Sequence, residues 1–233
     1  MQLTKEAVAK RIDHSIVEQD ATEAGIRIGC AEAREYGFGA FYVNPCYLKL
    51  AKDLLQDSGI PVGTTVSFPH GATITEVKLH ETAQVLHMGA DIIDVVMNVG
   101  MFKSGKVEYV RRELEQVIEK ARSIRQDVII KVIIETCNLS REEIVSAATM
   151  VKEVGADYVK TSSGCQARGA TVDEIRLIKG TVGDAIKVKA AAGINTAQKA
   201  LAMIEAGADC IGEIAGIAIV EGLDIALAAR QER

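Results

Sequence analysis

Three lysines lie within short apolar segments that have the composition of buried strands: Lys131 in VIIKVII, Lys160 in DYVKT and Lys189 in IKVKA. Lysine is seldom buried, because removing an ammonium group from water is unfavourable unless the charge is paired or lost. Two ammonium groups in one apolar pocket lower each other's pKa, and a neutral lysine attacks carbonyl carbons to form a Schiff base. Lys160 and Lys189 are therefore candidates for imine chemistry, which makes or breaks carbon–carbon bonds without a metal.

An imine mechanism also needs a group that moves protons. Asp94, in the segment DIIDVVMN, is the first candidate, followed by Asp13 and Glu135. Two interpretations of Lys131 stay open. It either belongs to the site or forms an ion pair with a buried carboxylate.

These side chains need elements that bring them together, and the sequence alternates short apolar runs with longer amphipathic segments. The strand-like runs lie at 11–16, 39–43, 62–67, 91–96, 128–134, 157–161, 186–190 and 209–214. The helix-like segments lie at 22–37, 45–57, 73–88, 105–125, 140–154, 171–180, 196–206 and 216–230. This alternation predicts parallel strands with helices outside, and eight such units fit a (β/α)8 barrel, which typically takes ~250 residues.

We therefore expect an α/β protein with a single (β/α)8, or TIM-barrel, domain spanning residues 1–233. A doubly wound open sheet is the alternative. No G-x-G-x-x-G motif follows the first strand, which argues against the dinucleotide-binding form of that fold. In a barrel, chemistry takes place where the strands end, and Lys160 and Lys189 lie near the ends of neighbouring strands.

Short local patterns support the order of the elements. The tripeptide Gly-Ala-Asp recurs at 89–91, 155–157 and 207–209, each time before an even-numbered strand. We interpret its glycine as the end of a helix and its small residue as packing at the bottom of the barrel. Thr22, Thr73, Ser140 and Thr171 are expected to cap helix N-termini, because a glutamate follows each of them within the first turn.

Composition excludes several classes of protein. The net charge is −5, from 27 Lys and Arg against 32 Asp and Glu, which argues against binding to a nucleic-acid backbone. Five cysteines without a C-x-x-C pair fit a reducing compartment better than a disulfide framework. The N-terminus has no apolar run of signal-peptide length, and the apolar stretch Ile214 to Val220 is shorter than the ~20 residues that span a bilayer. We expect a cytoplasmic protein that binds neither nucleic acid nor membrane.

The sequence also predicts neither a metal nor a cofactor. Its four histidines form no H-x-H or H-E-x-x-H pattern, and no nucleotide-binding loop or nucleophile elbow is present. His14 and His70, near strand ends, are open to two interpretations, as substrate contacts or as structural histidines.

The sequence resembles the deoxyribose-phosphate aldolase family along nearly its whole length. The matching segments are IDHSIVEQDAT at 12–22, VNPCY at 43–47, FPHGATITEVK at 68–78, ADIIDVVMNVGMFKSG at 90–105, KVIIETCNLS at 131–140, DYVKTSSG at 157–164, GATVDEIRLIK at 169–179, VKAAAGINT at 188–196 and LAMIEAGAD at 201–209. Segments VKTSSG and VKAAAG are the most specific part of this resemblance.

The resemblance implies a class I aldolase on a (β/α)8 barrel that reversibly splits 2-deoxy-D-ribose 5-phosphate into acetaldehyde and glyceraldehyde 3-phosphate. It places Lys160 at the Schiff-base position, Lys189 at the position that lowers the pKa of Lys160, and Asp94 at the proton relay. It implies supporting roles for Asp13 and Lys131, no cofactor, a small aldehyde or sugar phosphate as substrate, and a homodimer. By the same resemblance the substrate-binding set comprises Asp13, Lys131, Ser163, Gly164, Gly193, Asn195, Gly212 and Glu213.

The sequence departs from the family where its phosphate is bound. By the resemblance, a Gly-Gly pair followed by Arg is expected after the seventh strand, where this chain has Ala192 and Asn195 at the first Gly and the Arg. After the eighth strand, Glu213 and Ala215 stand where hydroxyl groups are expected. An ionised Glu213 beside a phosphate would repel it by ~1 kcal/mol or more at an effective dielectric near 20. Either Glu213 points away and the remaining amides hold phosphate, or the pocket takes another aldehyde, with Arg168 as a further source of positive charge.

Three hypotheses for the function follow. The first is the metal-independent aldolase just described. The second keeps the imine chemistry but changes the acceptor to an unphosphorylated or differently charged aldehyde. The third is a noncatalytic ligand-binding barrel, against which the retained Lys160, Lys189 and Asp94 argue.

Overall fold

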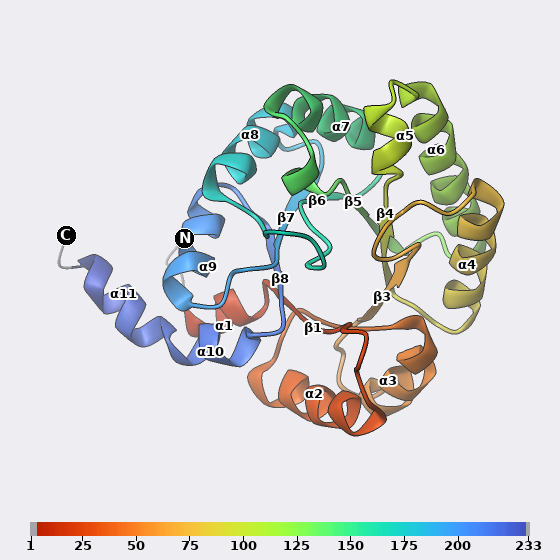
Figure 1. Ribbon diagram of the computed structural model, residues 1–233. Coiled ribbons are helices and arrows are strands. Elements are labelled where there is room, and N and C mark those ends of the chain that lie inside the picture. Colours follow the sequence, from red (N-terminus) through yellow and green to blue (C-terminus); the bar gives the residue numbers. More distant parts are fainter. Residues whose placement is uncertain (1–3, 232–233) are drawn as a thin grey trace.

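The computed structural model, which describes residues 4–231, is a closed barrel of eight parallel strands surrounded by helices (Figure 1). The strands are β1 (Ile12–Ile16), β2 (Ala40–Val43), β3 (Val62–Val66), β4 (Ile92–Val96), β5 (Ile129–Ile133), β6 (Tyr158–Lys160), β7 (Lys187–Ala191) and β8 (Cys210–Glu213). Each strand pairs with the next along the chain, and β8 pairs with β1 to close the barrel. The expected TIM barrel is confirmed, and the open sheet is excluded.

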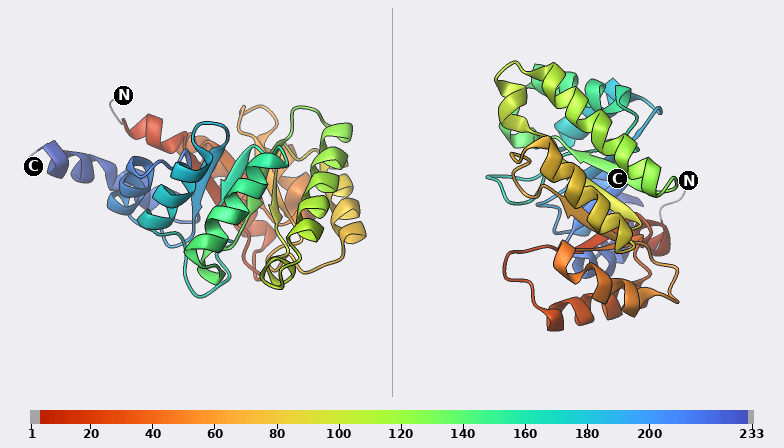
Figure 2. Two further views of the ribbon diagram at one scale, coloured as in Figure 1. Left: turned by 90° about the horizontal axis from the view of Figure 1, so that it is seen from above. Right: turned by 90° about the vertical axis from the view of Figure 1, so that its right-hand side faces the viewer.

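The helices lie outside the strands, as Figure 2 shows in two further views. They are α1 (Lys5–Ala9), α2 (Glu23–Tyr36), α3 (Leu48–Leu55), α4 (Thr75–His87), α5 (Val99–Lys103), α6 (Val107–Ile124), α7 (Arg141–Glu153), α8 (Val172–Val182), α9 (Ala197–Glu205), α10 (Gly216–Glu221) and α11 (Leu223–Gln231). Two 3-10 turns, η1 (Pro45–Tyr47) and η2 (Thr136–Asn138), follow β2 and β5. Within the described residues, no helix is long and apolar enough to cross a membrane.

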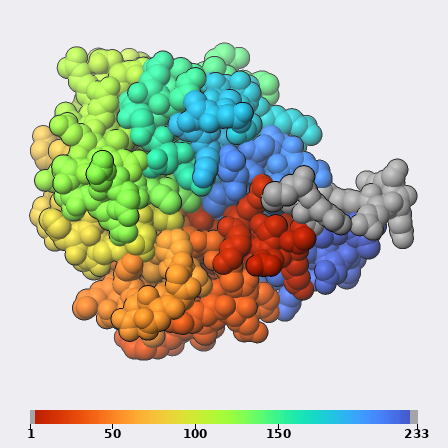
Figure 3. Space-filling model, turned by 180° about the vertical axis from the view of Figure 1, so that it is seen from behind, coloured from red at the N-terminus to blue at the C-terminus, as the bar shows by residue number. Residues whose placement is uncertain are grey.

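The expected helices form, with differences at several of their ends and with two additional short helices. The segment 45–57 begins as the 3-10 turn η1, and the segment 216–230 divides into α10 and α11 with Gly222 between them. Helices α1 and α5 were not expected, because five residues are too few to show a helical period. Seen from behind, the red α1 lies against the blue C-terminal part of the chain (Figure 3).

The expected N-caps are confirmed at Thr22, Ser140 and Thr171, and the latter two form complete capping boxes. The expectation for Thr73 is wrong. Helix α4 begins at Thr75 with Ile74 at its N-cap, and the Thr73 hydroxyl lies 2.7 Å from Ser67 Oγ instead. The loop after β3 therefore uses this hydroxyl to hold its own turn.

The main hydrophobic core lies between the strands and the helices, whereas the inside of the barrel is largely polar. Side chains alternate along β1: Ile12 and His14 pack outward, and Asp13 points into the barrel. His14 stacks on Phe38 at 4.8 Å and its Nε2 lies 3.0 Å from Glu32 Oε2. His14 is therefore a structural histidine, one of the two interpretations that the sequence left open.

The recurrent Gly-Ala-Asp tripeptide has a structural role at the bottom of the barrel that goes beyond small-residue packing. Its aspartate carboxylate accepts the N–H of an odd-numbered strand: Asp91 from Val62 (2.8 Å), Asp157 from Ile130 (2.7 Å) and Asp209 from Val188 (2.9 Å). In each pair the aspartate N–H also donates to the carbonyl of the same partner residue. A basic side chain then binds each carboxylate: Lys52 and Arg125 at Asp91, Arg122 at Asp157, and Lys179 at Asp209. This repeat fixes the register of neighbouring strands and so the positions of the side chains above.

We predict that Asp157→Ala lowers the free energy of unfolding by about 2 kcal/mol, because charge-assisted hydrogen bonds to Arg122 and Ile130 are lost. Urea unfolding followed by circular dichroism measures the change. The control is Asp184→Ala, whose side chain is fully exposed. Equal unfolding midpoints for the two variants would contradict the role of the tripeptide.

Candidate active site

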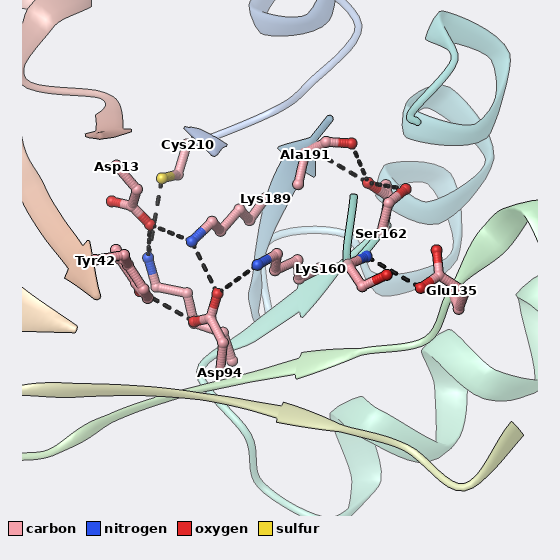
Figure 4. Close-up of polar contacts among 12 residues, drawn as sticks. Asp13, Tyr42, Asp94, Glu135, Lys160, Ser162, Lys189, Ala191 and Cys210 are labelled. Carbon is pink, nitrogen blue, oxygen red and sulfur yellow. Dashed lines mark hydrogen bonds and ion pairs between the residues drawn. The ribbon is translucent and has the colours of Figure 1, made fainter. Parts of the chain in front are cut away.

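Five charged side chains meet inside the barrel, and Figure 4 labels four of them: Asp13, Asp94, Lys160 and Lys189. The five are Asp13 from β1, Asp94 from β4, Lys131 from β5, Lys160 from β6 and Lys189 from β7, and all are buried. The strand register explains the meeting, because Asp94 lies opposite Lys131 and Lys160 opposite Lys189. Residues opposite one another on paired strands project to the same side, here the inside.

Asp94 is the centre of this cluster. Its Oδ2 accepts hydrogen bonds from Lys160 Nζ at 2.7 Å and from Lys189 Nζ at 2.9 Å. Burial favours protonation of the carboxyl, but the charges of Lys160 and Lys189 outweigh burial and lower the pKa of Asp94. The structure thus holds an ionised carboxylate between two amines.

Lys160 is the amine at the floor of the pocket. Burial lowers the pKa of Lys160, and the charge of Lys189 lowers it further, while Asp94 acts in the opposite direction. Its side chain is 9% exposed, compared with 2% for Lys189. The structure therefore brings together the two lysines singled out from the sequence and leaves Lys160 the more accessible one.

A second carboxylate anchors the other side of the cluster. Asp13 Oδ2 lies 2.6 Å from Lys189 Nζ and 2.6 Å from Lys131 Nζ. Burial would raise the pKa of Asp13, but Lys131 and Lys189 hold it far below its ordinary value. Burial would lower the pKa of Lys131, and Asp13 instead raises it above its ordinary value. Lys131 thus forms the buried ion pair that the sequence left open, beneath the pocket.

Tyr42 completes the floor, although it was not among the candidate site residues predicted from the sequence. Its hydroxyl donates to Asp94 Oδ1 at 3.0 Å, and Lys189 Nζ lies 3.8 Å from the centre of its ring. Two glycines make room here: a Cβ at Gly63 would lie 2.5 Å from the Tyr42 ring, and one at Gly212 would lie 2.6 Å from Lys189 Cε. The available signal was alternation, because Ala40 and Tyr42 share the inward face of β2.

A cavity of about 250 Å³ opens above this floor at the C-terminal ends of the strands. Lys160, Lys189 and Tyr42 line its base, and Glu18 and Glu213 are its acidic residues. Ser15 and Thr65, which the sequence analysis did not name, also line it; each follows an inward position of its strand by two residues. A small carbonyl compound in this cavity can reach Lys160.

The expected substrate-binding residues divide into three groups. Ser163, Gly164, Gly193, Gly212 and Glu213 line the cavity. Asp13 and Lys131 lie beneath it, within the ion-pair cluster. Asn195 is exposed, accepts a hydrogen bond from Lys199 Nζ at 3.1 Å and is not among the residues that line the cavity.

Glu135 and Arg168 lie apart from the lysines. Glu135 Oε2 accepts the Ser163 N–H at 3.1 Å and so holds the loop after β6 (Figure 4). Arg168 donates to both oxygens of Glu174, at 3.0 and 2.7 Å. Its charge is therefore engaged there and does not serve the cavity. Among residues 4–231, no three His, Cys, Asp or Glu side chains are grouped as metal ligands.

Comparison with known proteins agrees with this geometry. The family model described as DeoC/LacD family aldolase matches residues 7–222. The deoxyribose-phosphate aldolase of Thermoanaerobacter sp. is 45% identical over 214 residues, which cover 92% of this chain and 96% of that protein. Two solved structures are also similar. The aldolase QR15 has a TM-score of 0.88 at 37% identity and covers 95% of this chain and 98% of its own. The tetrameric deoxyribose phosphate aldolase of Aeropyrum pernix has a TM-score of 0.88 at 29% identity and covers 95% and 92%.

The match to the family model and the identity to the bacterial relative both extend over most of the chain, and the barrel carries a buried, amine-rich floor beneath an open cavity. The chain is an aldolase and belongs to the DeoC/LacD family.

Proposed function

We propose that this aldolase reversibly cleaves 2-deoxy-D-ribose 5-phosphate into acetaldehyde and glyceraldehyde 3-phosphate through a Schiff base on Lys160. The name of its relative supports the substrate. The observation that carries the mechanism is the buried Lys160 amine, whose pKa is lowered, in contact with Asp94 at the base of the cavity.

Cleavage begins on the open-chain sugar. The neutral Lys160 amine attacks carbon 1, and loss of water gives an iminium ion. The C3 hydroxyl then gives up its proton and becomes a carbonyl as the C2–C3 bond breaks. The electron pair of the C2–C3 bond flows into the iminium. Glyceraldehyde 3-phosphate leaves, an enamine remains on Lys160, and protonation at C2 followed by hydrolysis releases acetaldehyde. The iminium is itself the electron sink, so the mechanism requires no metal or cofactor.

Asp94 is proposed to move the protons. Its Oδ2 contacts Lys160 Nζ, so it can accept a proton from that nitrogen or return one to it. An ordered water molecule would extend its reach to the C3 hydroxyl and C2. Because Tyr42 and Lys189 also bind this carboxylate, it keeps its orientation while Lys160 changes from amine to iminium.

Lys189 is proposed to keep Lys160 nucleophilic. Its ammonium shares an Asp94 oxygen with Lys160 and is held there by Asp13. A positive charge at this place disfavours a second one on Lys160. These interactions also argue against a noncatalytic barrel, because a pocket that only binds a ligand does not require an amine whose pKa is lowered.

We place the reaction in the cytoplasm and propose a homodimer, as the sequence resemblance implies. All five cysteines are free thiols, which supports a reducing compartment.

The first test is covalent trapping. Incubation with acetaldehyde followed by borohydride should convert Lys160, and neither Lys131 nor Lys189, to N-ethyl-lysine, as peptide mass spectrometry will show. Lys160→Met should lose the label and on the order of 10³-fold or more in kcat. The matched control is Lys187→Met, which removes an exposed lysine at the first position of β7 and should keep both label and activity. Label on another lysine, or label that persists in Lys160→Met, would contradict the mechanism.

The second test concerns the role of Lys189. Lys189→Met removes a positive charge beside Lys160, so the pKa of Lys160 should rise and its amine should stay protonated to a higher pH. The acid limb of the pH profile of imine formation should therefore move to higher pH, whereas Lys187→Met should leave it in place. A limb that stays or moves to lower pH in Lys189→Met would show that Lys189 does not lower the pKa of Lys160.

A further inference from the structure

Two backbone N–H groups at the mouth of the cavity converge on one side chain. Ile194, in the loop after β7, donates to Glu213 Oε2 at 2.9 Å, and Ile214, directly after β8, donates to Glu213 Oε1 at 3.0 Å. Both oxygens of the Glu213 carboxylate are thus held by main-chain donors, and Glu213 lines the cavity. Of the two orientations that the sequence left open, the side chain takes the one toward the site.

The contact lies in the loops after β7 and β8. In (β/α)8 barrels the loops after the seventh and eighth strands frequently bind phosphate through backbone N–H groups. Here the anion at those donors is part of the protein. A phosphate on the substrate would have to displace the carboxylate or bind beside it, against a charge of the same sign.

Among the described residues that line the cavity, the only cations are Lys160 and Lys189, and both bind Asp94 at its base. Arg168 is bound to Glu174, and Lys199 Nζ donates to the Gly193 carbonyl at 3.0 Å and to Asn195. Neither Arg168 nor Lys199 lines the cavity.

The other groups at the mouth also fit an uncharged ligand better than an anion. Ala192 and Ile214 contribute apolar surface, and Glu18 adds a second carboxylate. The Ala192 N–H is itself bonded to the Gly212 carbonyl at 3.2 Å. Hydroxyl groups of a substrate can donate to the remaining lone pairs of Glu213, which a fully ionised phosphate cannot do.

We propose that Glu213 is a specificity-determining residue that occupies the anion position of the site, so that the aldolase cleaves unphosphorylated 2-deoxyribose about as efficiently as its 5-phosphate. The inference rests on the proposed imine chemistry at Lys160 and concerns only the far end of the substrate. The acceptor class that it names is a neutral polyhydroxy aldehyde.

The test compares kcat/KM for 2-deoxyribose 5-phosphate with kcat/KM for 2-deoxyribose, with acetaldehyde release as the common readout. In the unaltered enzyme the ratio should be below ten. Glu213→Ser frees both N–H groups and should raise the ratio at least tenfold, mainly through a lower KM for the phosphate. Inorganic phosphate should likewise inhibit 2-deoxyribose cleavage at least tenfold more strongly in Glu213→Ser.

Asp184→Asn is the control, because it removes a fully exposed carboxylate that does not line the cavity; it should change the ratio less than threefold. If Glu213→Ser does not fold, Glu213→Gln takes its place with a threefold rise as the threshold. A ratio above ten in the unaltered enzyme, or a smaller rise than the stated threshold, overturns the inference. Acetaldehyde trapping on Lys160 is measured in parallel. If the unaltered enzyme shows no trapping, the proposed imine mechanism has failed, and this result is distinct from failure of the specificity inference.

Discussion

One carboxylate oxygen shared by two buried lysines is the interaction on which this active site depends. Asp94 Oδ2 binds both Lys160 and Lys189 inside a barrel that excludes most water. Within the cluster, Asp13 and Asp94 face three lysines, so full ionisation would leave one positive charge without a counter-charge. Burial makes that excess positive charge unfavourable. Lys160 is the lysine that loses its proton most easily, because its pKa is lowered.

The other charges in the cluster determine which lysine loses its proton. Lys131 and Lys160 each contact a carboxylate that also binds Lys189. The charges of Asp13 and Asp94 nevertheless raise the pKa of Lys131, whereas burial and the charge of Lys189 lower the pKa of Lys160. The strands impose this asymmetry, because their register places Lys160 opposite Lys189 and Asp94 opposite Lys131. The carboxylates of the Gly-Ala-Asp repeat fix the register of the intervening strand pairs from below, β5 with β6 at Asp157 and β7 with β8 at Asp209, so the bottom of the barrel contributes to the chemistry at its top.

The sequence predicted the strands and the reactive amines because both depend on short-range patterns. Apolar runs interrupted by lysine mark both a strand and an unusual buried charge, as at Lys160 and Lys189. Side-chain partners across the barrel left no such pattern. Tyr42 and Asp94 are 52 positions apart, and only closure of the barrel brings the hydroxyl to the carboxylate. Thr73 shows the same limit locally, since a capping residue and a turn residue look alike until the loop is folded.

Strand β8 shows how the floor and the mouth of the site can change independently. Glycine at position 212 leaves room for Lys189, because a Cβ there would lie 2.6 Å from Lys189 Cε. The next residue, Glu213, hydrogen-bonds to the main chain of the two loops and to none of the lysines. A substitution at 213 therefore alters what the far end of the substrate meets while leaving Lys160, Lys189 and Asp94 in place. This separation explains how a chain can keep the imine chemistry of its family and still recognise a different acceptor.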